Sequence, residues 1–102
     1  MIKPSNGRIV WFTPPQGEPT TIVQHDINQP LTAQIVHVWG DRMVNLVVFD
    51  SHGVMHAVPQ VMLLQDDDAK PSLGRFAVWM PYQKGQAAKT EQLEQKFGGG
   101  GA

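Results

Sequence analysis

Aromatic and cationic side chains recur close together along this chain and offer its clearest candidate chemistry. Tryptophan rings stack on planar groups such as nucleobases, and the arginine fork binds phosphate bidentately. The segment Trp39-Gly40-Asp41-Arg42 places one of each at the tip of an expected hairpin. We therefore predict an anion-binding site around Trp39 and Arg42. The remaining candidates are cations or rings within a few residues of another aromatic residue: Arg8, Arg75, Tyr82 and Lys84.

Each of these residues also has an ordinary structural interpretation. In a small barrel, tryptophans such as Trp11 and Trp39 commonly fill the core or an interface. Arg42 could pair with Asp41 or Asp50 on the surface, which contributes little to stability. Arg42→Ala separates the two interpretations, because only a ligand-binding arginine would weaken binding without changing the melting temperature.

The four histidines do not form a metal-binding motif. His52 and His56 are four residues apart, a spacing that places two imidazoles together only on a helix. Here a turn and a strand are expected, and four strand residues span roughly 13 Å. The acidic run at residues 66–68 lacks the spaced oxygen ligands of a calcium loop. We predict no metal site and no cofactor.

No local pattern nominates a catalytic nucleophile and base. The chain has no cysteine, no Gly-x-Ser-x-Gly motif and no phosphate-binding glycine loop between a strand and a helix. We therefore predict a protein without catalytic residues.

The composition describes one small globular domain. The chain has 102 residues, 41% of them hydrophobic, and a net charge of −1. A protein that binds nucleic acid or anionic membranes non-specifically is normally basic, so both functions are disfavoured. No apolar run approaches 18 residues, and the N-terminus lacks a signal-peptide pattern. We expect a soluble, cytoplasmic protein.

Ten glycines and eight prolines divide the chain into short segments, a pattern that favours strands over a helical bundle. Residues 31–58 predict a three-stranded meander with tight turns near Gly40 and Gly53. Within it, the alternation over 31–39 places His37 and Trp39 on the same face as Leu31. Pro59 predicts that the next stretch lies at a sheet edge, although the apolar run Val61 to Leu64 should be buried. The predicted strands of one antiparallel system are residues 8–13, 31–39, 43–49, 54–58 and 75–80, with a further short strand possible at 21–23.

The C-terminal part predicts a helix. Residues 83–97 are rich in helix-forming Ala, Gln, Lys and Glu, with a thin apolar stripe of Thr90, Leu93 and Phe97. Gly98 to Gly101 would end this helix. We predict a mainly β protein, a small, strongly bent antiparallel sheet or barrel of the Src-homology or OB type (1–82), followed by a helix and Gly-rich tail (83–102).

Fourteen apolar residues would fill one such barrel. Val47 and Phe49 lie on a strand that is apolar on both faces, so the helix or another subunit should cover them. The predicted core consists of Ile9, Trp11, Ile22, Leu31, Ile35, Val38, Val44, Leu46, Val48, Phe49, Val58, Leu63, Phe76 and Val78.

Three segments together resemble a family of small uncharacterised proteins of tailed bacteriophages and prophages. They are Gly7 to Trp11, Asp41 to Asp50 with Gly53, and Trp79 to Lys89, which reads WMPYQKGQAAK. The resemblance covers most of residues 4–90 and implies a phage origin and expression in the bacterial host cytoplasm. It carries no assigned activity and no site residues.

Two classes of function follow. The first is a phage-encoded, non-enzymatic anti-defence or host-takeover protein that captures a signalling nucleotide or a similar anion as a homo-oligomer, with pockets at subunit boundaries. The second is a structural virion component (a head-completion, connector or tail piece) or an inhibitor that binds a host protein. The aromatic–arginine pairs favour the first class.

Overall fold

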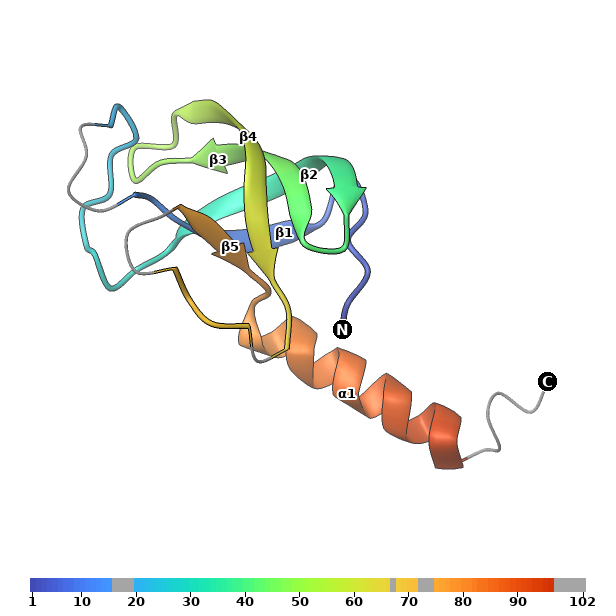
Figure 1. The fold of residues 1–102 in the computed structure, drawn as a ribbon. Coiled ribbons are helices and arrows are strands. Elements are labelled where there is room, and N and C mark those ends of the chain that lie inside the picture. Colours follow the sequence, from blue (N-terminus) through green and yellow to red (C-terminus); the bar gives the residue numbers. More distant parts are fainter. Residues whose placement is uncertain (16–19, 67, 72–74, 97–102) are drawn as a thin grey trace.

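The computed structural model describes residues 1–15, 20–66, 68–71 and 75–96, with side chains through residue 90. Five strands form a closed barrel, and one helix leads away from it (Figure 1). The mainly β fold with a C-terminal helix is thereby confirmed. The elements are β1 (Ile9–Thr13), β2 (Leu31–Gly40), β3 (Met43–Phe49), β4 (Met55–Leu64), β5 (Phe76–Val78) and α1 (Pro81–Lys96).

The sequence predicted a wholly antiparallel sheet, but one pair of strands in the barrel is parallel. β1–β2, β2–β3, β3–β4 and β1–β5 are antiparallel, but β4 and β5 are parallel neighbours, with Leu63 opposite Ala77. A parallel pair needs a connection that crosses from one end of the sheet to the other. β5 then closes the barrel by pairing with β1 on its other side.

β1 has the opposite phase from the prediction. Val10 and Phe12 are fully buried, whereas Ile9 and Trp11 are only half-buried. Four consecutive apolar residues carry no alternation, so both phases satisfy the pattern equally well. Pairing of Val10 with Ala33 of β2 places Val10 and Phe12 inside.

A bulge in β2 overturns the predicted alternation. Leu31, Ala33 and Ile35 point into the core, but the register shifts between Ile35 and His37. The extra residue reverses the faces beyond it, so His37 and Trp39 are exposed while Val38 packs partly against the core.

β4 continues through Pro59 to Leu64, beyond the predicted end at Val58. The proline is tolerated because the strand is irregular there: the register shifts opposite β3, and Gln60 takes a left-handed conformation with φ of 52°. Val61 and Leu63 are buried, as predicted, but the predicted edge position is wrong, because β4 pairs with β3 on one side and β5 on the other.

The remaining differences are local. Residues 21–23 form no strand, β5 is shorter than predicted, and α1 begins at Pro81 instead of residue 83. The side chain of Leu93, residue Phe97 and the expected helix end at 98–101 lie outside the described residues. Phe49 and Val78, predicted to be core residues, are half-buried, as is Ile22, which packs against the core.

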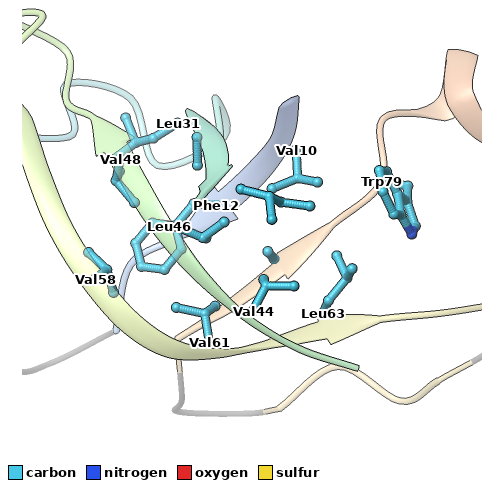
Figure 2. Close-up of a cluster of buried hydrophobic side chains, with 13 residues drawn as sticks. Val10, Phe12, Leu31, Val44, Leu46, Val48, Val58, Val61, Leu63 and Trp79 are labelled. Atoms are coloured by element: carbon cyan, nitrogen blue, oxygen red, sulfur yellow. The ribbon is translucent and has the colours of Figure 1, made fainter. Parts of the chain in front are cut away.

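The core is one cluster inside the barrel, and Trp79 closes its end near the start of α1 (Figure 2). Phe12 and Leu46 lie among the valines of the facing strands. Seven buried residues were absent from the predicted core: Val10, Phe12, Ala33, Val61, Leu64, Ala77 and Trp79. No helix in the part of the chain described is long and apolar enough to cross a bilayer.

Candidate functional site

The end of the barrel next to α1 is organised by one buried amide. Gln65 is 1% exposed and follows directly on β4. Its Oε1 accepts hydrogen bonds from Ile2 N (3.2 Å) and Trp79 Nε1 (3.1 Å). Its Nε2 donates to Ile2 O and Asp41 O, both at 2.8 Å. All four hydrogen-bonding positions of the amide are used, so Gln65 ties the N-terminal segment, the β2–β3 turn and β5's exit together.

Arg8 lies on this end of the barrel, above the buried Trp79. Its guanidinium carbon is 4.9 Å from the centroid of the indole ring, within the range of a cation–π contact. Arg8 makes no ion pair with any described residue. Among the described residues, no group accepts a hydrogen bond from its guanidinium, and the ring below holds the side chain in place.

Gln83 fixes the direction in which α1 leaves the barrel. Its Oε1 accepts a hydrogen bond from Met80 N (2.8 Å), the reciprocal half of a capping box, and Pro81 occupies the first helical position. Its Nε2 donates to Ile9 O of β1 at 2.8 Å. One side chain thus caps the helix and attaches it to the sheet.

A groove runs between the N-terminal residues and the first turns of α1. We call it the N-terminal groove; its two adjoining hollows measure about 140 and 420 Å³. The smaller hollow lies over Trp79 and Gln65, and the larger one is bounded by Arg8 and the helix. Its lining includes Met1, Ile2, Arg8, Tyr82, Lys84, Gln86 and Ala87.

Three of the six predicted site residues line this groove. Arg8 and Tyr82 border the larger hollow, and Lys84 borders the smaller one. Tyr82 is 71% exposed, so its ring is open to solvent at the groove's edge. As candidates for anion binding, these residues came after Arg42 and Trp39 in the sequence-based prediction. They are nevertheless the ones that the fold brings together.

Arg42 lies beside the groove but is engaged by a carboxylate. Its Nε donates to Asp68 Oδ2 at 2.8 Å, and its Nη1 lies 3.8 Å from the sulfur of Met1. The hydrogen bond and charge of Arg42 lower the pKa of Asp68, and the same pair raises the pKa of Arg42. The structure thus replaces the expected surface partners, Asp41 or Asp50, with Asp68.

Trp39 and Arg75 lie away from the N-terminal groove. The Trp39 indole donates to Asn45 Oδ1 (2.8 Å) on the outer face of β3, whereas Arg42 is bound to Asp68. Arg75 Nη2 donates to Pro59 O (2.9 Å) and borders a separate hollow beside His56. The predicted joint site at the β2–β3 tip is therefore divided between two surfaces.

A second polar cluster closes the opposite end of β3. Asp50 Oδ1 accepts hydrogen bonds from the backbone N–H groups of His52 (2.9 Å) and Val54 (3.0 Å), and Oδ2 lies 2.8 Å from His56 Nε2. The hydrogen bond with His56, followed by those from backbone N–H groups, lowers the pKa of Asp50 to about 2. This pair was not predicted, because the spacing of His56 from His52 bears only on a metal site and no local pattern connects His56 with Asp50.

Gln65 was missed as well, although a weak signal exists. A polar residue directly after the buried run Val61 to Leu64 is unusual unless its hydrogen bonds are satisfied inside. Among the described residues, no three His, Cys, Asp or Glu side chains gather where they could hold a metal ion. The rings of His25 and His52 meet edge to face at 4.6 Å, without a third such group.

No protein-family model, no curated protein and no solved structure matched this chain in three comparisons.

Proposed function

We propose that this chain is a non-enzymatic binding protein that captures a small anionic ligand of the nucleotide class in the N-terminal groove. The observation that carries the proposal is Arg8. Its guanidinium lies over Trp79, 4.9 Å from the ring centroid, has no carboxylate partner among the described residues and borders a hollow of about 420 Å³. A preorganised, unpaired arginine at a concave surface is well suited to phosphate.

Tyr82 and Lys84 complement Arg8. Tyr82 offers an exposed ring on which a nucleobase could stack. Lys84 borders the neighbouring hollow, where the Asp66 carboxylate is paired with the N-terminal ammonium at 3.1 Å. The larger hollow lies within the usual range for small-molecule sites. An anti-defence or host-takeover role and a location in the host cytoplasm depend on the resemblance to phage proteins alone, which carries no assigned activity and does not identify the ligand.

Calorimetric titration with cyclic and ADP-ribose-type nucleotides tests the proposal. Arg8→Ala should weaken binding about 10- to 100-fold, the range expected for a hydrogen bond between charged groups. Arg8→Lys should recover affinity only in part, because lysine lacks the bidentate fork. Arg75→Ala is the matched control, since Arg75 borders a different hollow. Equal affinities for the parent and Arg8→Ala would refute the site, and a panel without any binding would refute the ligand class.

One observation favours the alternative class, a structural virion component. α1 runs away from the barrel instead of folding back onto it (Figure 1). It therefore does not cover Val47 and Phe49, which are half-buried without it, contrary to the prediction that the helix could cover them. A projecting helix is a natural contact for another subunit. Presence of the protein in purified virions, together with a silent nucleotide panel, would favour this class, whereas self-association is expected of both classes.

A further inference from the structure

Trp39 is an exposed tryptophan that the strand turns outward. The alternation of β2 would place it inside with Leu31 and Ile35, but the bulge after Ile35 leaves it 58% exposed. Exposing a large ring forfeits the burial that normally stabilises tryptophan in a small barrel. Packing in the core therefore does not explain the position of Trp39.

Two contacts hold the exposed indole in a defined orientation. Its Nε1 donates to Asn45 Oδ1 at 2.8 Å, and the His37 ring meets it edge to face with the centroids 4.5 Å apart. Asn45 Oδ1 also accepts the N–H of Gln60 at 2.8 Å. Gln60 has a φ of 52°, a backbone conformation that residues other than glycine rarely adopt. We call His37, Trp39, Asn45 and Gln60 the Trp39 platform.

The platform offers hydrogen bonds but no charge. Within the described residues, the Asn45 side-chain NH₂, the His37 ring nitrogens and the Gln60 side-chain amide have no hydrogen-bond partner. The strands β2, β3 and β4 contain no Lys, Arg, Asp or Glu. Arg42, the nearest cation in sequence, is held by Asp68. Arg75, which donates to Pro59 O next to Gln60, is engaged as well. The platform's own groups therefore suit a ligand that is neutral and rich in hydroxyl or amide groups.

We propose that the Trp39 platform binds a neutral carbohydrate. One face of the indole can stack on the C–H face of a pyranose ring, while the neighbouring amides and imidazole exchange hydrogen bonds with its hydroxyl groups. A nucleotide would require a cation at this place. An apolar protein contact would bury polar groups of the platform without partners, which is costly. This site is separate from the N-terminal groove and does not depend on the function proposed there.

Native electrophoresis in gels containing dextran, soluble starch or hydroxyethyl cellulose tests the proposal. At least one of these neutral polysaccharides should retard the protein, and the matching hexasaccharide should change tryptophan fluorescence. Trp39→Ala should weaken binding about tenfold or more, and Trp39→Phe should retain part of it. Asn45→Ala, which frees the ring, should cost several-fold without removing any stacking surface. Met55→Ala, another exposed apolar side chain of the same sheet, is the matched control.

The salt dependence distinguishes this site from the anion site. Binding to a neutral sugar should stay constant from about 50 to about 500 mM NaCl, whereas binding at Arg8 should weaken. Absence of retardation by all three polysaccharides would overturn the proposal. So would equal retardation of Trp39→Ala in a folded state shown by circular dichroism. A Trp39 response to a mononucleotide or a proline-rich peptide, but to none of the sugars, would overturn it too.

Discussion

The two ends of strand β3 are each secured by one buried polar side chain, and the two differ in charge. At the end near α1, Gln65 makes four hydrogen bonds as a neutral amide. At the other end, Asp50 accepts two backbone N–H groups and pairs with His56 as a carboxylate. Both solve the same problem, since a closed barrel still leaves backbone groups at its ends to be satisfied.

Because of this difference in charge, acid affects the stability of the two ends differently. The Gln65 amide does not titrate, so its hydrogen bonds are independent of pH. The pKa of Asp50 falls from 3.8 to about 2 on folding. Because the pKa of Asp50 is lower in the folded state, the carboxylate stabilises the folded state fully when the pH lies above the pKa of the unfolded state. This contribution disappears as the pH falls from about 4 to about 2.

Gln65→Leu should produce the largest loss of stability. It keeps the volume roughly constant but leaves the buried Trp79 Nε1–H and the backbone groups of Ile2 and Asp41 without their partners. We expect a loss of about 2–4 kcal/mol: the buried Trp79 Nε1–H costs about 1–3 kcal/mol when it is unsatisfied, and the backbone groups of half-buried Ile2 and exposed Asp41 cost less because water reaches them. Urea unfolding measures it. Gln24→Leu, which removes one exposed hydrogen bond, is the control; similar losses for both variants would contradict a hub at Gln65.

Asp50→Asn should give a smaller loss, and one that depends on pH. The variant retains an oxygen for the backbone N–H groups of His52 and Val54 but loses the charge facing His56. At pH 7 its melting temperature should lie below that of the parent, and the two should converge between pH 4 and pH 2. Asp26→Asn, at an exposed turn, is the control. A constant difference across this pH range would show that the charge of Asp50 does not matter.

Gly53→Ala should cost about 1 kcal/mol through the backbone alone. Gly53 has a φ of 82° in the turn secured by Asp50, with open space around the added methyl group. Gly7→Ala, at a φ of 94° in the N-terminal segment, should cost about the same. Gly85→Ala in α1 should instead increase helix stability. Chemical unfolding of the three variants measures this, and an unchanged Gly53→Ala would indicate that the turn relaxes.

Arg42→Ala should have the smallest effect on stability. The Arg42–Asp68 pair lies at the surface of the Gln65 end, with side chains 52% and 30% exposed. Water and salt screen such a pair, so the change in melting temperature should not exceed the scatter of replicate melts. A clear loss that disappears at high salt would mean that the neutral end also depends on a charge.

The sequence by itself determined the elements with strong local signals. The turns near Gly40 and Gly53 delimit the predicted meander, because turn residues act locally. Val44, Leu46 and Val48 were predicted as core residues and are buried, but β3 is apolar on both faces, so its sequence left open which face is the core. The C-terminal helix also follows from composition, although Pro81 begins it earlier than predicted.

Tertiary structure decided the features that depend on pairing between distant segments. The bulge after Ile35 turns Trp39 outward, and its position follows from the register against β3 and not from β2 alone. The four adjacent apolar residues of β1 acquire an inside and an outside only when β2 and β5 pair with them. Arg8 and Tyr82, 74 positions apart by their numbers, meet in one groove because Gln83 attaches α1 to β1. The environment of each of these side chains depends on residues that are distant in sequence and become neighbours only on folding. A local sequence pattern does not include those residues.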